Sequence, residues 1–272
     1  MELDISVALI GAGAMGEAII SGLLRQGVVR AERILAAEPR AERRDELSRR
    51  YGILMSNDNL DVARQGEVVI FAVKPQVLQT VLLSLHGMLR GDALCLSIMA
   101  GTAIRTFTTG LDRAAVVRAM PNTPAQIGEG MTVWTASPGV SEPQREWVRS
   151  ILGALGQTLF VEDERYLDMA TAINGSGPAY VFLILEAMID AGVHLGFSRS
   201  DAETLVLQTV YGSVSYARQS GHHPAQLRNA VTSPGGTTAA GLSMLERGGL
   251  RTTLSDAIWA AYHRSSELGR KE

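Results

Sequence analysis

The sequence predicts an α/β protein with an N-terminal doubly wound domain and a C-terminal all-helical domain. Up to residue 161, short apolar stretches alternate with amphipathic helical stretches, and the apolar stretches lack the polar alternation of a half-exposed sheet. After residue 164 the strand pattern stops, and segments rich in Ala, Leu, Glu and Gln follow. A length of 272 residues also suits two domains. We predict one domain over 1–164 and a second over 165–272.

In the first domain, apolar runs mark the strands and periodic runs mark the helices. Strands buried on both faces by intervening helices form parallel sheets, so we expect a parallel sheet with helices on each side. The predicted strands cover 7–10, 34–37, 67–73, 93–98, 114–119, 131–136 and 158–161, and the predicted helices cover 14–26, 41–51, 76–86 and 142–152.

The second domain consists of helices separated by Gly, Pro and Ser. The run 181–185 (VFLIL) is apolar on every side of its helix, so we expect it to be surrounded by protein. A helical module of this size would hardly enclose it alone, which predicts pairing with another subunit. The predicted helices cover 166–173, 179–195, 199–219, 224–230, 238–247 and 250–267.

Composition makes several classes of protein improbable. With 25 basic and 28 acidic residues, the formal charge is −3, which gives no footprint for nucleic acid or an anionic membrane. The single cysteine, Cys95, excludes an internal disulfide and a Cys-rich metal site. The histidines lack metal-ligand spacing. The N-terminus lacks a signal peptide's basic region, and the apolar segment 180–195 is interrupted by charges and too short to span a bilayer. We expect a soluble cytoplasmic protein without metal.

A G-x-G-x-x-G turn follows the first predicted strand and opens the first predicted helix. This context is the dinucleotide fingerprint, in which glycines let a pyrophosphate approach the N–H groups at a helix N-terminus. The alternative is a glycine-rich turn without a ligand, which this context makes less favourable. The predicted cofactor residues here are Gly11, Ala12, Gly13, Ala14, Met15 and Gly16.

The end of the second strand carries conflicting signals about the cofactor. An acidic residue such as Glu38 accepts from the ribose hydroxyls of NAD, whereas an Arg such as Arg40 accommodates the 2′-phosphate of NADP. Arg43 and Arg44 follow one turn later, either as part of this site or as a solvated helix face. We expect NADPH, with NADH also possible.

Two further loops end predicted strands, where open α/β sheets bind ligands. Residues 72–75 end an apolar strand, although Lys74 can also be read as a solvated loop charge. Residues 120–124 (MPNTP) end another strand, with two prolines that restrict the backbone. The predicted cofactor residues in these loops are Ala72, Val73, Lys74, Pro75, Asn122 and Pro124.

The segment 231–238 (VTSPGGTT) precedes a helix in the second domain. A proline and paired glycines shape a rigid turn there, and helix N-terminal N–H groups bind small carboxylates. A well-capped interhelical turn would use the same residue types, and the residues alone leave both interpretations open. The predicted substrate residues are Ser233, Gly235, Gly236, Thr237 and Thr238.

Over essentially its whole length, the sequence resembles the pyrroline-5-carboxylate reductases. The matching motifs are GAGAMG at 11–16, AVKPQ at 72–76, MPNTP at 120–124, GSGPAY at 175–180 and VTSPGGTTAAGLSMLE at 231–246, of which the last is highly specific. The resemblance implies NAD(P)H-dependent reduction of 1-pyrroline-5-carboxylate to L-proline, a Rossmann domain, a helical dimerisation domain and higher oligomers of dimers. Asn174 stands where the family usually has a serine, and Gly221 stands where members often carry an acidic residue.

The resemblance also implies roles for individual residues. Thr238 would bond the imine nitrogen and assist its protonation, while the backbone of 233–237 holds the substrate carboxylate. Ser176 and Gly177 would contact the substrate, with Asn122 and Pro124 near the nicotinamide. Two alternatives remain, namely a reductase of a related cyclic imine carboxylate and a non-enzymatic NAD(P)-sensing protein.

Overall fold

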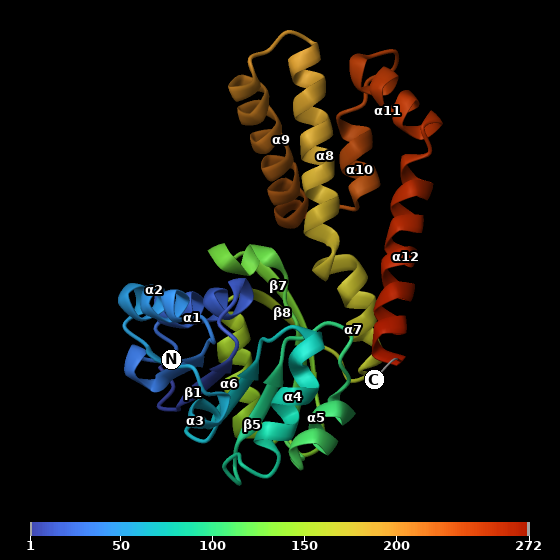
Figure 1. The fold of residues 1–272 in the computed structure, drawn as a ribbon. Helices are drawn as coiled ribbons and strands as arrows, with labels where there is room; N and C mark the ends of the chain where they lie inside the picture. The colour runs from blue at the N-terminus through green and yellow to red at the C-terminus, as the bar shows by residue number, and fades with distance from the viewer. Residues whose placement is uncertain (1, 271–272) are drawn as a thin grey trace. The chain divides into compact units, whose positions relative to one another are not determined.

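A computed structural model describes residues 2–270 of the chain (Figure 1). The chain forms two compact units, the first made of Met1–Pro178 with Ala261–Glu272 and the second of Ala179–Ala260. The chain passes between the units inside two helices, α8 (Gly177–His194) and α12 (Leu250–Arg270). The parts of the chain before residue 179 and after residue 260 therefore both pack in the unit that contains the sheet. The boundary at 164/165 stays a prediction about which part of the chain carries which function.

The first unit contains an eight-stranded sheet with the order β3-β2-β1-β4-β5-β6-β7-β8. Val7 pairs with Ile34 on one side and Val68 on the other, so β1 lies between β2 and β4. The strand order reverses at β1 and β4, which is the switch point where such sheets bind ligands. The strands are β1 (Val7–Ile10), β2 (Ile34–Ala37), β3 (Leu54–Ser56), β4 (Val68–Phe71), β5 (Leu94–Ser97), β6 (Val116–Met120), β7 (Gly130–Ala136) and β8 (Gly156–Phe160).

Helices cover both faces of this sheet, as the apolar strands predict. Leu9 packs in one apolar cluster with Ile19 and Ile151, whereas its neighbour Ile10 packs in a second cluster with Phe107. Successive residues of a strand point to opposite faces, so each strand contributes to both clusters. The first layer contains α1 (Ala14–Arg25), α2 (Ala41–Tyr51) and α6 (Glu142–Gly153), and the second contains α3 (Asn59–Ala63), α4 (Pro75–Leu85) and α5 (Ile104–Leu111).

The sheet is not entirely parallel, which corrects one expectation. Strands β6 and β7 are antiparallel, with Met120 opposite Val133, while the other neighbouring strands are parallel. Only the loop 121–129 joins β6 to β7. A parallel connection needs a crossover of a dozen or more residues, so this loop is too short to carry the chain back to the other end of the sheet.

Strand β3 and the helices α3 and α5 of the first unit were not predicted. Strand β3 and helix α3 span only three and five residues, too few for a clear periodic pattern. Helix α5 has the sequence IRTFTTGL, in which Thr, Ile and Gly disfavour a helix. Its Gly110 serves close packing, because a Cβ there would lie 2.8 Å from a side-chain carbon of Leu82 in α4. Tertiary contact thus outweighs local propensity in α5.

One helical stretch is longer than the sequence suggests. Helix α7 (Arg165–Ala170) continues through a π turn (Thr171–Gly175) into α8, giving a 30-residue helix from Arg165 to His194. By length and composition alone, this helix could cross a membrane, and little of its most apolar part is buried within the chain. The expectation that the apolar segment is too short is therefore wrong, because it considered only 180–195.

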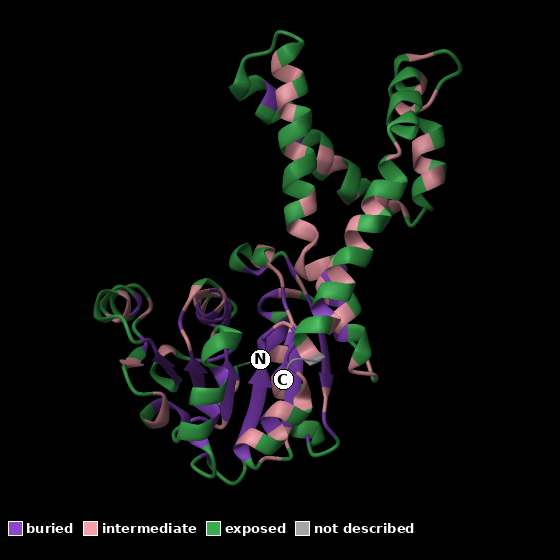
Figure 2. Cartoon of the chain, turned by 45° about the vertical axis from the view of Figure 1, so that its right-hand side comes forward, coloured by how far each residue is buried: buried purple, intermediate pink, exposed green. Residues whose placement is uncertain are grey.

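The second unit has few buried side chains (Figure 2). Phe182 and Leu183 are 60% and 65% exposed, so the apolar run 181–185 is not enclosed within this chain. This exposure is in keeping with the predicted pairing of subunits. Besides parts of α8 and α12, the unit contains α9 (Arg199–Ser220), α10 (Pro224–Ala230) and α11 (Thr237–Arg247).

A buried arginine ties α7 and the end of α12 to the sheet. Arg118 of β6 is 5% exposed and pairs with Glu164 at 3.1 Å and Asp168 at 2.8 Å. Glu164 also accepts a hydrogen bond from the backbone N–H of Ile104, and Asp168 accepts one from the hydroxyl of Ser265. Each carboxylate therefore joins the arginine to another element of the first unit.

We expect Arg118→Ala to destabilise the first unit, because it leaves two carboxylates close together without their cation. The free energy of unfolding should fall by about 2 to 4 kcal/mol, since both carboxylates keep part of their hydration. Denaturant unfolding measures this loss. Arg165→Ala is the control, because Arg165 pairs with Asp163 at the surface and its removal should change stability little. Equal losses in both variants would contradict the role of the buried network.

Candidate functional site

The glycine turn after β1 depends on two close backbone approaches. Gly11 has φ +98°, and a Cβ there would lie 2.9 Å from the carbonyl oxygen of Ala72. A Cβ on Gly16 would lie 2.5 Å from the carbonyl oxygen of Gly11. These two glycines are required by packing, because the neighbouring atoms are backbone and cannot move aside. They bring the start of α1 against the ends of β1 and β4.

The middle glycine of the turn has a different environment. Gly13 is the N-cap of α1 with φ −69° and ψ −167°, and no side chain caps the helix. A Cβ on Gly13 would meet nothing within 4 Å, so space is open in front of the helix N-terminus. The first N–H groups of a helix lack partners within it and favour an anion. The turn 11–16 thus fits the pyrophosphate of a dinucleotide.

An acid and an arginine meet at the end of β2. Glu38 is buried, and its Oε1 accepts hydrogen bonds from Nε of Arg40 at 2.8 Å and from the backbone N–H of Arg40 at 3.3 Å. Burial raises the pKa of Glu38, but the hydrogen bonds from Arg40 outweigh it and leave the pKa below its ordinary value. The glycine turn is adjacent, since the N–H of Gly11 donates to Ala37. Glu38 and Arg40, which give conflicting signals about the cofactor in the sequence, therefore form an ion pair in the structure.

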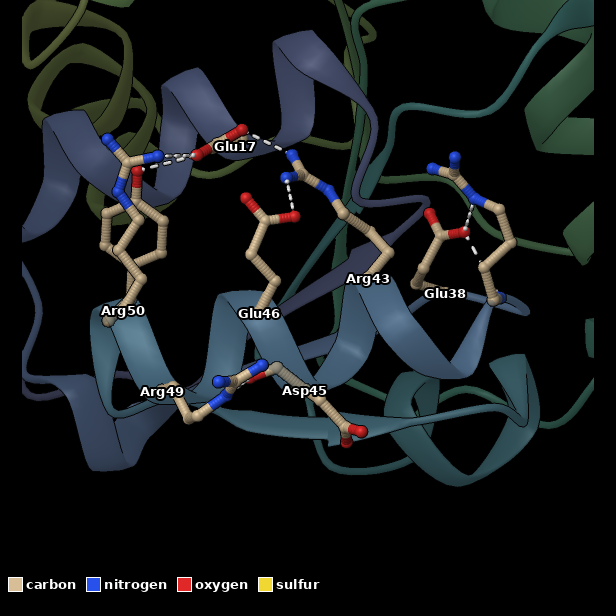
Figure 3. A network of polar contacts seen from close by, with 9 residues as sticks. Glu17, Glu38, Arg43, Asp45, Glu46, Arg49 and Arg50 are labelled. Carbon is tan, nitrogen blue, oxygen red and sulfur yellow. Dashed lines mark hydrogen bonds and ion pairs between the residues drawn. The ribbon is translucent and has the colours of Figure 1, made fainter.

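The following arginines have structural partners instead of a free face (Figure 3). Arg43 donates to Glu17 of α1 and to Glu46, and its side chain is only 17% exposed. Glu17 also accepts from Arg50 at 3.0 Å and from the hydroxyl of Tyr51 at 2.8 Å. Burial raises the pKa of Glu17, but the bond from Arg43 and the other donors lower it overall.

Arg43 and Arg44 therefore do not form a solvated helix face, and their part in the cofactor site stays a prediction. Arg43 is occupied by Glu17, a residue that sequence reasoning did not single out. Arg44 donates to the carbonyl oxygens of Glu38 and Pro39 at 2.9 and 2.8 Å. The only sequence signal for Glu17 was an acid in the first turn of the helix that follows the glycine motif.

The loop after β4 lies beside the glycine turn. The N–H of Ala72 donates to Ile10 at 2.9 Å, and a Cβ on Gly11 would also touch Val73. Lys74 is the exposed N-cap of α4, with Pro75 at the first helical position. The structure thus brings 72–75 together with 11–16 at the switch point.

The loop after β6 holds the two remaining cofactor candidates. Pro124 lies in a short 3-10 turn, Thr123–Ile127, that packs against α1. Asn122 directly precedes this turn, and its side-chain Oδ1 accepts a hydrogen bond from the N–H of Met131 at 2.9 Å. Asn122 therefore has a structural role in shaping the loop that carries Pro124.

The predicted substrate residues are divided between the two units. Ser176 and Gly177 lie in the first unit, where Ser176 closes the π turn and Gly177 begins α8. A Cβ on Gly177 would meet nothing within 4 Å, so the start of α8 is open. The other candidates, from Ser233 to Thr238, lie in the second unit.

The segment 233–238 forms a turn at an uncapped helix. The N–H of Gly236 donates to Ser233 at 3.1 Å, and Gly235 has φ +69°, as a type II turn with Pro234 at its second position requires. Gly236 is the N-cap of α11, and no side chain caps this helix either. The capping interpretation of Ser and Thr is therefore not what the structure shows at this N-cap.

The chemistry available at this turn suits a small carboxylate. Ser233, Thr237 and Thr238 are exposed and lie within three residues of the N-cap Gly236, so hydroxyl donors are available beside the N–H donors of the helix N-terminus. Cys95 offers no alternative nucleophile, because burial raises the pKa of its thiol to about 12. Within residues 2–270, the structure groups no three His, Cys, Asp or Glu side chains that could hold a metal ion.

Two family models match the chain, one in each half. A model described as NADP oxidoreductase coenzyme F420-dependent matches residues 6–101, which contain the glycine turn. A model described as pyrroline-5-carboxylate reductase dimerisation matches residues 164–268, which contain the exposed apolar helix. The chain is accordingly an oxidoreductase that uses a nicotinamide cofactor, acts on a small molecule and forms a homo-oligomer.

Full-length relatives carry one description. Pyrroline-5-carboxylate reductase from Synechocystis is 43% identical over 269 residues, 99% of this chain and 100% of the relative, and that from Pisum sativum is 40% identical over 97% and 96%. Among solved structures, the Plasmodium falciparum pyrroline carboxylate reductase with NADP bound has a TM-score of 0.91 at 32% identity, covering 99% and 100% of the two chains. The Coxiella burnetii pyrroline-5-carboxylate reductase has a TM-score of 0.90 at 35% identity, covering 98% and 99%. The chain belongs to the pyrroline-5-carboxylate reductase family.

Proposed function

We propose that this protein reduces 1-pyrroline-5-carboxylate to L-proline with NAD(P)H, the last step of proline synthesis. The bound nicotinamide supplies a hydride to the carbon of the C=N bond. The observation that carries the proposal is the turn 233–238, which combines an uncapped helix N-terminus with exposed hydroxyls in one segment. Such a site orients a carboxylate substrate and needs no nucleophile of its own.

The proposed roles follow from the donors of this turn. The N–H groups at the start of α11 and the hydroxyl of Ser233 hold the substrate carboxylate, with Gly235 and Gly236 allowing its approach. Thr237 contributes to the same contact. The hydroxyl of Thr238 donates to the imine nitrogen and delivers or relays the proton that this nitrogen gains. Ser176 and Gly177 are proposed to contact the substrate as well.

The cofactor is proposed to bind along the carboxyl ends of the strands. Residues 11–16 hold its pyrophosphate, and 72–75 together with Asn122 and Pro124 contact its nicotinamide half. Of the nitrogens of Arg40, Nε and the backbone N–H are the ones that donate to Glu38 among the described contacts, and the side chain of Arg40 is 69% exposed. Its outer nitrogens can therefore pair with a 2′-phosphate. We infer a preference for NADPH, with NADH accepted through Glu38.

The assembly and location of the protein complete the proposal. We infer a homodimer built mainly on residues 165–272, which assembles further into a higher oligomer. The support is the exposed apolar surface of α8, which falls inside the dimerisation match. Residues 1–164 then act as the dinucleotide-binding domain. The protein is proposed to work in the cytoplasm.

Gly13→Val tests the cofactor site. Its side chain would enter the open space before α1, where the pyrophosphate must approach, so cofactor affinity measured by fluorescence titration should collapse. The fold should persist with a stability loss of about 1 kcal/mol, because valine is a poor N-cap. Gly153→Val is the control, since a Cβ there also meets open space but at the end of α6. An unchanged titration in folded Gly13→Val would reject the site.

Arg40→Ala tests the choice of cofactor. The Michaelis constant for NADPH should rise roughly 10-fold more than that for NADH, since one charge-assisted contact to the 2′-phosphate is lost. Arg49→Ala is the control: it removes the same charge from the helix that Arg40 precedes, but Arg49 bonds the backbone of Asp45 on the side away from Glu17 (Figure 3). Steady-state kinetics with both cofactors decide, and equal effects of Arg40→Ala on both would reject the role.

Thr238→Ala tests the substrate chemistry. Because its hydroxyl bonds a nitrogen that changes charge during the reaction, kcat should fall roughly 10- to 1000-fold. Ser243→Ala is the control, a hydroxyl further along the same helix. Gly236→Ala should instead raise the Michaelis constant for the imine, because its Cβ would lie 2.3 Å from Oγ of Ser233 and displace that hydroxyl. Full turnover by Thr238→Ala with excess imine would move the chemistry elsewhere.

A further inference from the structure

The π turn between α7 and α8 places an asparagine against the sheet. The N–H of Ser176 donates to Thr171 at 2.8 Å, five residues back, which is the hydrogen bond of a π turn. The extra residue rotates the turn relative to an uninterrupted α-helix, and such turns are frequent at functional sites. The side chain that meets the sheet from this turn is that of Asn174.

Asn174 bridges the two strands that flank the loop 121–129. Its Nδ2 donates to the carbonyl oxygen of Met120 at 3.1 Å and to that of Met131 at 3.0 Å. Met120 ends β6, and Met131 lies at the start of β7. The N–H of Met131 is in turn bonded by Asn122 from within the loop. The N–H and the carbonyl oxygen of Met131 are therefore both bonded by side-chain amides, the N–H by Asn122 and the carbonyl oxygen by Asn174 of the π turn.

The orientation of this amide is set by its surroundings. Exchanging its nitrogen and oxygen would place Oδ1 against two carbonyl oxygens, so the two donors must face the strands. Oδ1 is then buried and has no hydrogen-bond partner among residues 2–270. A buried acceptor without a partner lowers the stability of the fold, so the presence of an asparagine here needs a reason other than stability. The bridge to the two strands is the feature that the asparagine provides.

We propose that Asn174 is a positioning residue for hydride transfer, which holds the loop of Asn122 and Pro124 in register with the turn of Ser176 and Gly177. The inference rests on the proposed function, which assigns the loop to the nicotinamide and the turn to the substrate. Reacting atoms must approach to about 3 to 3.5 Å, and a displacement of about 1 Å can lower a rate about 100-fold. All of these residues lie in the first unit.

Three variants grade the loss of the bridge. Asn174→Ala removes both donors, Asn174→Asp places an acceptor oxygen against the two carbonyls, and Asn174→Ser offers a single donor. Thr171→Ala is the matched control. Its hydroxyl belongs to the same π turn but bonds the carbonyl oxygen of Leu167 inside the helix, so its loss disturbs the turn without releasing the loop.

Hydrogen–deuterium exchange tests the bridge directly, and kinetics test its consequence. Exchange over residues 120–132 should be faster in Asn174→Ala and Asn174→Asp, and unchanged in Thr171→Ala. Cofactor affinity should change much less than kcat, because the glycine turn still holds the pyrophosphate. We expect kcat to fall roughly 10- to 100-fold in Asn174→Ala, with Asn174→Ser intermediate. The isotope effect on kcat, measured with cofactor deuterated at the transferred position, should rise as hydride transfer becomes limiting.

Each contrary result overturns the inference in a recognisable way. Unchanged exchange in Asn174→Ala and Asn174→Asp would show that the bridge does not hold the loop. Faster exchange with unchanged kcat and isotope effect would show a structural tie without a role in positioning. A wild-type protein that fails to oxidise the cofactor with 1-pyrroline-5-carboxylate would refute the proposed function and the hydride role together, while the exchange result would still decide whether Asn174 holds the loop.

Discussion

The close approach of α1 to the ends of β1 and β4 is the constraint on which the cofactor half of the protein depends. Gly11 and Gly16 leave no room for a Cβ, because backbone carbonyl oxygens of Ala72 and of Gly11 itself occupy that space. The parallel pairing of β1 with β4 holds these carbonyls in place. The helix N-terminus therefore opens at the switch point of the sheet, where its unpaired N–H groups favour an anion.

Two glutamates near this opening form ion pairs with the surrounding arginines. Glu17 pairs with Arg43 and Arg50, while Glu38 pairs with Arg40. Both acids stay ionised at neutral pH, because their donors lower each pKa despite burial. The positive charge available to a ligand is consequently smaller than the number of arginines at Arg40 and in α2 suggests.

In the second unit, a single chain leaves much of its apolar surface exposed. Phe182 and Leu183 of α8 remain exposed, although their helix is apolar throughout. A match to a dimerisation model covers this region, and the chain forms a homo-oligomer. The length and apolar character of the helix, which would also suit a membrane, therefore agree with contact between subunits.

The amino-acid sequence by itself determined the α/β and helical halves, most element positions, the glycine turn and the segment 233–238. These features follow from local patterns, since apolar periodicity, glycine spacing and proline placement act over a few residues. Tertiary structure alone decided the helix α5, the pairing of Glu17 with Arg43 and the bridge from Asn174 to Met120 and Met131. Most of these involve groups far apart in the chain, and α5 forms against its own weak propensity. No local pattern encodes which partner a buried polar group or a close-packed helix will find once the sheet has formed.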